Sequence, residues 1–262
     1  MDKIHFHKYQ GTGNDFIILD GRTTDFRSIL SPDKIQSICD RRFGVGADGL
    51  MILNNYPDVD FEMVYYNSDG RTSSMCGNGG RCLVAYAYRL GIINESCTFI
   101  AIDGKHHARL RDTDRVELKM IDVDKLEVGT STCVLNTGSP HYISFEEQVN
   151  DLDIIRKARA IRYSDRFSEV GINVNFVAPD GEGIQVRTYE RGVEDETFSC
   201  GTGVTAAAIA FAEATKQLGN LEIPIVTKGG KLSVKLEKTY GEARNIWLCG
   251  PATFVFEGFI EL

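Results

Sequence analysis

The sequence predicts an α+β protein built by internal duplication of one unit, and two short segments carry this prediction. Residues 75–81 read MCGNGGR and residues 199–205 read SCGTGVT. Each segment places a cysteine at the head of a Cys-Gly-x-Gly turn, and each turn opens a run of helix-forming residues that ends at a glycine. Pairs of β-like runs, joined at Gly104 and at Gly229, follow the two cysteines at nearly equal distances. A repeat over this length predicts two copies of one α+β unit.

The two cysteines are the candidate reactive groups. Cys76 and Cys200 both precede a predicted helix N-terminus, where free backbone N–H groups and the helix dipole favour negative charge. We therefore expect lowered thiol pKa values and predict that each cysteine acts as a base or a nucleophile. The paired glycines let a ligand approach the backbone closely.

Composition limits the classes of partner. The 262-residue chain carries a net charge of -8 and no cluster of Lys and Arg, so nucleic acids and anionic membrane surfaces are not expected partners. The first ten residues are polar and charged, unlike a signal peptide, and no apolar run approaches the length of a membrane span. Seven cysteines, an odd number, without an export signal predict free thiols in a reducing cytoplasm.

The elements before Cys76 alternate strands, turns and one helix. The alternating residues 4–10 predict a strand, followed by a hairpin turn at Gly11 and Gly13. A third glycine and a following helix are missing, which argues against a dinucleotide site and leaves a ligand role of Asn14 open. Ser31 predicts the N-cap of a helix through residues 32–43, and two strands and a turn at residues 67–70 then lead to Cys76.

Strand patterns fill the region after the first predicted helix. His106 and His107 lie between them and have no third ligand at a suitable spacing, so we interpret them as solvent-facing hairpin residues. The acidic residues 120–130 mark the best domain boundary, which gives an N-terminal half of residues 1–120 and a C-terminal half of residues 121–262. Whether the final strand, at about residues 253–262, belongs to the second half or crosses back to the first is open.

The second half holds further polar candidates. Turn residues interrupt the β pattern at 136–141 and place His141 in a loop, and a helix is predicted over residues 151–163. Asn173 and Asn175 share one face of the next strand, either as site residues or as the exposed polar face of an edge strand. Glu190 and Arg191 then lead into the second cysteine turn.

Three chemistries could make use of such cysteines. A disulfide oxidoreductase needs its thiols close in sequence, typically as Cys-x-x-Cys, and this motif is absent. A cysteine hydrolase with His141 as its base uses one thiol and leaves the second turn unexplained. Two-base stereoinversion needs one acid and one base of similar type, with backbone N–H groups to stabilise the developing charge, and so uses both turns.

Six segments in order over most of the chain (GTGNDF, DRRFGVGADGL, NSDGRTSSMCGNGGRC, NTGSPH, NVNFV and YERGVEDETFSCGTG) together resemble the diaminopimelate epimerase family. The resemblance implies conversion of LL-2,6-diaminopimelate to the meso isomer, for lysine and peptidoglycan precursors. It implies a cytoplasmic isomerase that acts on a small molecule without pyridoxal phosphate or metal and is often a dimer. The implied fold has two pseudo-symmetric halves, each a mixed or antiparallel sheet wrapped around a central helix.

The resemblance also assigns roles to residues. Cys76 and Cys200 are the implied acid/base pair, and His141 and Glu190 are implied to tune their pKa values. The implied substrate-binding residues are Asn14, Asn67, Gly77, Asn78, Asn173, Glu190, Arg191, Gly201 and Thr202. Two positions depart from the family pattern: Ser139 replaces a common asparagine, and Gly49 stands where some members have glutamine.

Two alternatives stay open beside diaminopimelate epimerisation. One is a racemase for another amino acid on the same scaffold, which a panel of free amino acids would reveal. The other is a non-catalytic amino-acid-binding protein, which would bind its ligand without exchange of solvent protons.

Overall fold

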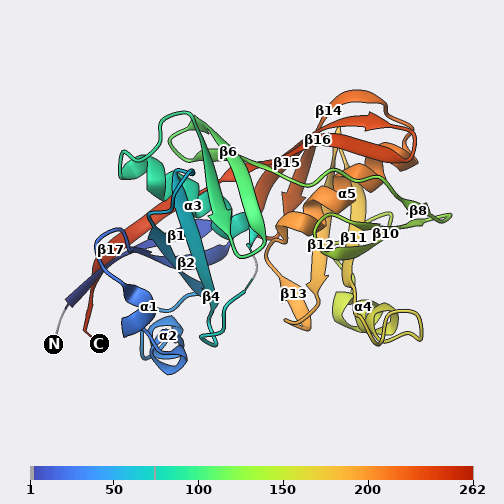
Figure 1. Cartoon of the computed structure of the whole chain (residues 1–262). Helices are drawn as coiled ribbons and strands as arrows, with labels where there is room; N and C mark the ends of the chain where they lie inside the picture. The colour runs from blue at the N-terminus through green and yellow to red at the C-terminus, as the bar shows by residue number, and fades with distance from the viewer. Residues whose placement is uncertain (1–2, 74, 262) are drawn as a thin grey trace. The chain divides into compact units, whose positions relative to one another are not determined.

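The computed structural model describes residues 3–73 and 75–261. The chain groups into two compact units, the first made of residues 1–118 with 250–262 and the second of residues 119–249 (Figure 1). The first unit therefore contains both ends of the chain, and the second is one continuous segment. Each unit is described by itself.

The first unit contains the helices and strands β1 (Lys3–Gly11), β2 (Asn14–Asp20), α1 (Phe26–Ile29), α2 (Pro32–Cys39), β3 (Gly49–Asn54), β4 (Phe61–Asn67), α3 (Gly77–Arg89), β5 (Ser96–Ala101), β6 (Gly104–Asp112), β7 (Arg115–Lys119) and β17 (Thr253–Glu261). Its strands pair in the order β17-β1-β2-β3-β4-β5-β6-β7. The β2–β3 and β4–β5 pairs are parallel and the others are antiparallel. The final strand thus pairs with the first.

The second unit contains β8 (Glu127–Val128), β9 (Thr132–Asn136), β10 (Pro140–Phe145), α4 (Ile154–Arg162), β11 (Asn173–Asp180), β12 (Gly183–Glu190), β13 (Asp195–Thr197), α5 (Gly201–Ala214), β14 (Gly219–Thr227), β15 (Gly230–Thr239) and β16 (Glu242–Pro251). Its main order is β8-β9-β10-β11-β12-β14-β15-β16, and β13 also pairs with β12. Here β10–β11 and β12–β14 are the parallel pairs.

The two units repeat one topology. Each unit begins with an antiparallel hairpin (β1–β2 and β9–β10). A helix then leads to a second antiparallel pair (β3–β4 and β11–β12), whose first strand lies parallel to the hairpin. The helix after the cysteine turn leads to an antiparallel meander (β5–β7 and β14–β16), whose first strand lies parallel to the second pair. Both parallel pairings are made by strands that a helix connects, as the geometry of parallel strands requires. The predicted duplicated α+β fold is confirmed.

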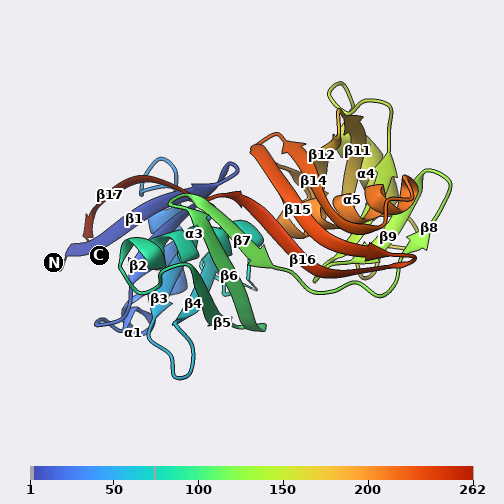
Figure 2. The same cartoon turned by 90° about the horizontal axis from the view of Figure 1, so that it is seen from above.

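Helices α3 and α5 are the central helices of the repeat. In α3 every residue from Gly77 to Ala87 is buried, and the helix packs against β1, β2, β3, β6 and β17. In α5 burial runs along most of the helix, which packs against β9, β10, β11, β12, β14 and β15. Figures 1 and 2 show each helix with the strands of its own unit on several sides. A helix that is buried around its whole circumference needs such surroundings.

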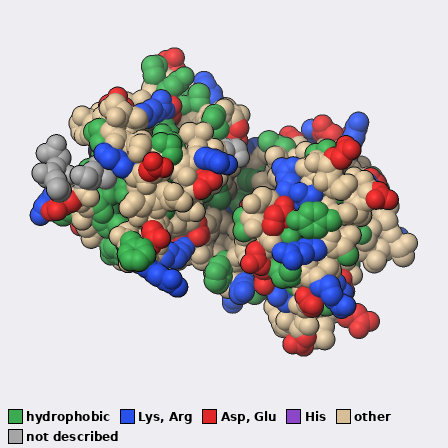
Figure 3. Space-filling model, turned by 90° about the horizontal axis from the view of Figure 1, so that it is seen from below, with side chains coloured by type: hydrophobic (Ala, Val, Ile, Leu, Met, Phe, Trp, Pro, Cys, Tyr) green, Lys and Arg blue, Asp and Glu red, His purple; other side chains and the backbone are tan. Residues whose placement is uncertain are grey.

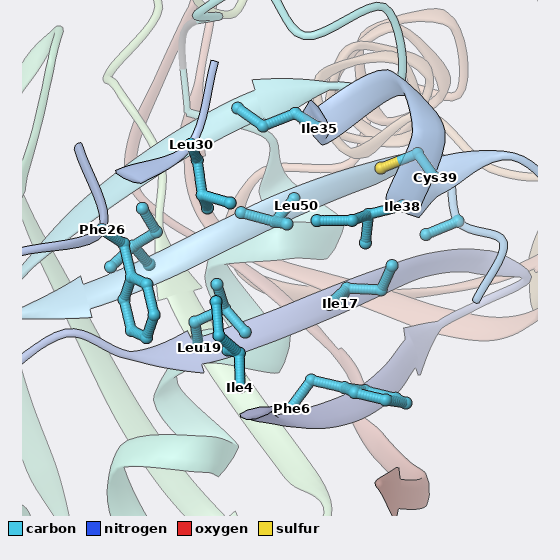
Figure 4. Close-up of a cluster of buried hydrophobic side chains, with 12 residues drawn as sticks. Ile4, Phe6, Ile17, Leu19, Phe26, Leu30, Ile35, Ile38, Cys39 and Leu50 are labelled. Carbon is cyan, nitrogen blue, oxygen red and sulfur yellow. The ribbon is translucent and has the colours of Figure 1, made fainter. Parts of the chain in front are cut away.

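A second layer of helix covers the outer face of the sheet in the first unit. Figure 4 shows Ile17 and Leu19 of β2 and Leu50 of β3 packed against Ile35 and Ile38 of α2. The neighbouring residues Phe16, Ile18 and Met51 are also fully buried, because β2 and β3 have a helix on each face. The second unit has an equivalent cluster beneath α4, formed by residues that include Ile154, Val174 and Phe176.

Several local predictions can be compared with the structure. Residues 12 and 13 form a two-residue hairpin turn, both with positive φ (50° and 85°), as the Gly-x-Gly pattern predicted. Ser31 caps α2 by accepting a hydrogen bond from the Lys34 backbone N–H. The helix ends at Cys39, earlier than predicted, because the Asp40 side chain accepts the backbone N–H groups of residues 42 and 43 and starts a turn.

Of the two interpretations left open for Asn173 and Asn175, the exposed face of an edge strand is wrong, because β11 pairs on both sides and both asparagines are buried. His106 and His107 belong to the β5–β6 hairpin, as interpreted, and both lie in β6. His107 is exposed as expected, whereas the His106 ring is partly buried and stacks on Phe99.

The surface carries both signs of charge. Figure 3 shows acidic and basic side chains interspersed over the face in view, in keeping with a modest net charge of -8. Among the residues that the structure describes, no helix combines the length and apolar character needed to cross a bilayer.

Candidate active sites of the two units

Cys76 is the N-cap of α3. Its backbone is extended (φ -95°, ψ 128°), its carbonyl accepts the first helical hydrogen bond from Gly80 at 2.7 Å, and its side chain does not cap the helix. The partly buried thiol therefore lies beside the free N–H groups of the first turn, where the helix dipole favours an anion. The local fold thus has the form that the sequence predicted.

Asn14 is a polar neighbour of this thiol. The Cys76 Sγ and the Asn78 Nδ2 both donate to the Asn14 Oδ1, at 3.5 and 3.4 Å. The amide nitrogen of Asn14 donates to Asp48 Oδ2 at 2.6 Å, which fixes the orientation of the amide. The hairpin turn therefore presents an oriented amide oxygen to the cysteine.

Asp48 belongs to a charged network behind Asn14. Its Oδ2 also accepts the Asp15 backbone N–H at 3.2 Å, and the Asp48 backbone N–H donates to Asp15 Oδ1 at 3.1 Å. Arg41 binds both carboxylates, and Lys8 binds Asp15 at 2.8 Å. Hydrogen bonds from Arg41 and Lys8 outweigh burial and lower the pKa of Asp15 to about 2, so this carboxylate stays charged.

Arg81 supports the same turn from inside the unit. This fully buried side chain donates to the Gly77 carbonyl, to Asn78 Oδ1 and to Thr12 Oγ1, at 3.2, 3.0 and 3.3 Å. It also donates to the Pro251 carbonyl at 3.4 Å. One guanidinium thus holds the start of α3, the hairpin turn and Pro251, the last residue of β16, together.

Asn67 and Gly49 lie opposite each other at the ends of β4 and β3. The Asn67 backbone opens the turn at residues 67–70, bonding to Arg71 and Gly70. A Cβ built at Gly49 would lie 2.5 Å from the Tyr66 carbonyl oxygen and 2.5 Å from the Tyr65 ring. Any larger residue at position 49 therefore requires the β3–β4 pairing to shift.

Cys200 is the N-cap of α5 and repeats the arrangement of Cys76. Its backbone is extended (φ -119°, ψ 115°), its carbonyl accepts from the Val204 N–H at 2.9 Å, and the side chain makes no cap. A Cβ at Gly203 would come within 2.5 Å of Asn175 Oδ1 and 3.2 Å of Cys200 Cβ. The second glycine of this turn is required by close packing.

A chain of hydrogen bonds leads from β11 to Cys200. Asn175 Nδ2 lies 3.1 Å from His141 Nδ1, His141 Nε2 lies 2.9 Å from Thr202 Oγ1, and Thr202 Oγ1 lies 3.5 Å from Cys200 Sγ. Thr188 donates to Asn175 Oδ1 at 2.9 Å, which fixes Nδ2 as the donor to His141. His141 is therefore protonated on Nε2 and donates to Thr202, which leaves the threonine hydroxyl hydrogen for Cys200.

Burial keeps His141 neutral. The side chain is fully buried, and desolvation together with the nearby Arg191 charge lowers its pKa to about 3. His141 therefore influences Cys200 through the Thr202 hydroxyl as a neutral donor. The loop position predicted for His141 was wrong: it is the second residue of β10, because the strand begins directly after the predicted turn and pairs with β9 and β11 there.

Asn173 and Ser139 are bonded to each other. Asn173 Nδ2 donates to Ser139 Oγ at 2.8 Å and to the Pro140 carbonyl at 3.2 Å, and its Oδ1 accepts the Arg191 backbone N–H at 2.8 Å. Asn173 thus joins the loop before β10 to the end of β12. The Arg191 guanidinium donates to the Val170 carbonyl at 2.9 Å, and Arg191 and Glu190 are both partly exposed.

The candidates gather into two groups, one in each unit. The first unit brings together Asn14, Cys76, Gly77 and Asn78, with Asn67 at the end of β4. The second brings together His141, Cys200, Gly201 and Thr202, with Asn173, Glu190 and Arg191 linked through the end of β12. Sequence reasoning missed Asp48, Arg81 and the role of Asn175. The buried arginine inside MCGNGGR and the second asparagine of NVN were the available signals.

The other cysteines differ from these two. Cys82 lies one turn into α3, and its complete burial raises the pKa of its thiol to about 12. Burial likewise raises the pKa values of Cys39 and Cys133 to about 11 and that of Cys97 to about 12. These thiols stay protonated and serve as packing groups.

Comparisons with known proteins agree on one family. The diaminopimelate epimerase family model matches residues 6–126 and 133–255. Diaminopimelate epimerase of Flavobacterium psychrophilum is 50% identical over 97% of this chain and 99% of its own length, and that of Aquifex aeolicus is 36% identical over 97% of each. Two solved structures share the fold at 14% sequence identity. The PhzF-family phenazine biosynthesis protein of Bacillus anthracis matches with a TM-score of 0.74 over 100% of both chains. The hydroxyproline epimerase of Agrobacterium vitis matches with a TM-score of 0.66 over 98% of this chain and 92% of its own.

Proposed function

Because the chain belongs to the diaminopimelate epimerase family, we propose that it is an isomerase that interconverts LL- and meso-2,6-diaminopimelate. The reaction inverts one α-carbon. The observation that carries the proposal at the level of residues is the repeated cysteine N-cap, Cys76 on α3 and Cys200 on α5. Two equivalent acid/base groups are what inversion requires, since one must remove a proton and the other must return one.

In the proposed reaction one cysteine is a thiolate and the other a thiol. The thiolate takes the α-proton and becomes a thiol, and the electron pair of the broken C–H bond passes into the substrate carboxylate as an enediolate. The second thiol then donates its proton to the opposite face of the carbon and becomes the thiolate. The reverse direction exchanges the two roles, so a single pair serves both isomers.

The first turns of α3 and α5 supply the electrostatic part. Their free N–H groups and helix dipoles stabilise negative charge on a thiolate and on the substrate carboxylate as it takes up charge. We assign Asn14, Asn67, Gly77 and Asn78 of the first unit, and Asn173, Glu190, Arg191, Gly201 and Thr202 of the second, to substrate binding. Amide and guanidinium groups bind carboxylates without competing as bases.

His141 and Glu190 are assigned to tuning the cysteines. The Thr202 hydroxyl, which accepts from neutral His141 at 2.9 Å, is free to donate to Cys200 and so to favour its thiolate form. This supports a positioning role for His141 that does not require it to carry charge.

Three further features belong to the proposal. A reducing cytoplasm is supported by seven cysteines that are all free thiols. A homodimer is also part of the proposal, and it rests on the resemblance to the family alone. The proposed chemistry draws only on protein groups, so neither pyridoxal phosphate nor a metal takes part in it.

Proton exchange tests the proposal directly. LL-diaminopimelate is incubated with the protein in D2O without added cofactor, and the α-carbon is followed by NMR. The expected result is deuterium incorporation together with formation of the meso isomer. Exchange with another amino acid from a panel, and none with diaminopimelate, would instead establish a racemase of different specificity. Binding of diaminopimelate without exchange would contradict a catalytic role.

A further inference from the structure

Three potential metal ligands lie together on the outermost strand pair of the first unit. Strands β1 and β17 run antiparallel, with His7 opposite Glu257 and His5 opposite Phe259. Alternate residues of a strand project from the same face, so His5 and His7 share one side of the sheet with Glu257. The diaminopimelate reaction proposed above does not use these residues.

One carboxylate oxygen faces both imidazoles. Glu257 Oε2 lies 2.9 Å from His7 Nε2 and 3.9 Å from His5 Nε2. One ligand atom from each of the three residues can be chosen so that all lie within 4.8 Å of one another. A small rotation of the exposed Glu257 side chain, with the His5 ring kept on Phe259, would bring the three donor atoms toward the spacing of ligands around one ion, with metal–ligand distances of about 2.0–2.2 Å.

Aromatic packing holds the two imidazoles in place. The His5 ring stacks on Phe259 with the ring centroids 4.9 Å apart and an interplanar angle of 24°. The His7 ring is buried beside Tyr86, at a centroid distance of 4.8 Å. His5 and Glu257 are each 45% exposed, so an ion can enter from solvent. Ligands that are already ordered lose less entropy on binding.

We propose that His5, His7 and Glu257 form a binding site for a divalent transition-metal ion, and we take Zn²⁺ as the reference ion. Two imidazole nitrogens and one carboxylate oxygen are a donor set that Zn²⁺, Ni²⁺ and Co²⁺ accept, with water filling the remaining positions. Bound there, the ion would join the first strand of the chain to the last. We assign the ion a structural role, because it would join β1 to β17 and the proposed reaction uses none of its three ligands.

Arg89 gives the proposal a distinctive test. Its Nη2 lies 3.6 Å from Glu257 Oε2, and its guanidinium lies 4.0 Å above the Phe254 ring. In the absence of metal, Arg89 balances the glutamate, and a bound cation must compete with it. Removing the charge with Arg89→Gln should therefore strengthen metal binding, whereas loss of a ligand should weaken it.

The experiment titrates the purified full-length protein with Co²⁺ and competes the ion out with Zn²⁺. Wild type is expected to bind one Co²⁺ per chain with d–d absorption and without the sulfur-to-cobalt charge-transfer band of a thiolate site. His5→Gln and Glu257→Gln should each weaken binding at least about tenfold, and Arg89→Gln should tighten it. The side chains at all three positions are partly exposed, so we expect the variants to fold. Zn²⁺ should raise the melting temperature of the wild-type protein, and a chelator should reverse this increase.

A second histidine pair in the same unit provides the control. His106 and His107 are adjacent in β6, so their side chains project to opposite faces and cannot share an ion. His106→Gln and His107→Gln are expected to leave Co²⁺ affinity unchanged. The proposal is overturned if these changes weaken binding as much as His5→Gln does, if His5→Gln and Glu257→Gln bind like wild type, or if the spectrum shows thiolate ligation.

Discussion

Asn14 donates its amide hydrogen to Asp48 at 2.6 Å and presents its amide oxygen to the thiol of Cys76 at 3.5 Å. The orientation of the Asn14 side chain is thus set by the carboxylate behind it. The Cys200 thiol has a comparable arrangement, in which buried His141 orients the Thr202 hydroxyl. In each unit a buried or ion-paired group behind the cysteine fixes a polar atom beside it.

Removal of either N-cap cysteine should abolish epimerisation. Cys76→Ala and Cys200→Ala are each expected to lower the rate of meso-isomer formation by about a thousandfold or more, because each deletes one of the two proton-transfer groups. Rates are measured by NMR in D2O and folding by circular dichroism. Cys39→Ala, at a buried thiol whose pKa is raised to about 11, is the control and should keep its activity. Near-normal turnover of either N-cap variant would exclude the two-base mechanism.

Asp48→Ala should slow the reaction through Asn14. Without the carboxylate the Asn14 amide can rotate, and its oxygen is no longer held toward Cys76, so we expect kcat to fall about tenfold or more. Asp20→Ala is the control. It removes the ion pair between Asp20 and Arg22 at the other end of β2 from Asn14, and it should leave kcat unchanged. Equal kcat values for the Asp48 and Asp20 variants would show that the orientation of Asn14 is unimportant.

Thr202→Val should move the acidic limb of the kcat/KM profile to higher pH. The hydroxyl stabilises the Cys200 thiolate by donating to it, so its loss favours the protonated thiol and raises the thiol pKa. Thr202→Ser keeps the hydroxyl and should restore the wild-type profile. The Thr137 hydroxyl binds the Thr202 backbone carbonyl, a contact that both variants retain. An unshifted limb in the valine variant would remove Thr202 from the tuning of Cys200.

His141 should make the protein less stable in acid. Its pKa is lowered from 6.5 to about 3 in the folded protein, so between those values the unfolded chain binds a proton that the folded chain does not. Stability is therefore complete above about pH 6.5 and falls as the pH drops toward 3. In urea titrations, His141→Gln should reduce the pH slope of the unfolding free energy in this window by up to about 1.4 kcal/mol per pH unit.

The exposed His107 offers the comparison for this slope. His107→Gln is expected to retain the wild-type slope, since carboxylates such as Asp15 titrate equally in both proteins. If His141→Gln is as acid-sensitive as wild type, His141 is not the buried group that takes up the proton on unfolding.

Local patterns predicted the parts of the fold that local physics determines. The Cys-Gly-x-Gly segments indicated two turns at helix N-termini because their composition and the following helix formers are contiguous, and the two-residue turn at Thr12 and Gly13 follows from its glycines. Asn173 and Asn175 showed the limit of such patterns. A polar face in a strand is expected to be exposed, yet their partners, Ser139 and His141, are 34 residues away and make burial favourable.

The supporting residues of the sites were harder to predict for the same reason. Asp48 reaches Asn14 across 34 residues, and Arg81 reaches Thr12 and Pro251 across 69 and 170 residues. The periodic pattern of apolar and polar residues in a sequence does not predict contacts between residues so far apart in the chain. The turn at a helix N-terminus indicates Cys76, and the resemblance to the family indicates Asn78 and Thr202, but the partners that orient these side chains depend on how the strands pair.

The pairing of β17 with β1 has a consequence for synthesis. The second unit is one continuous stretch, so all of its strands can assemble before the last residues leave the ribosome. The first unit lacks its edge strand until residues 253–261 emerge. Until that point, β1 exposes unpaired backbone N–H and C=O groups along one edge. Strand β1 must therefore wait for β17 before both of its edges are paired, so it needs protection in the nascent chain for longer than strands whose partners are adjacent in sequence.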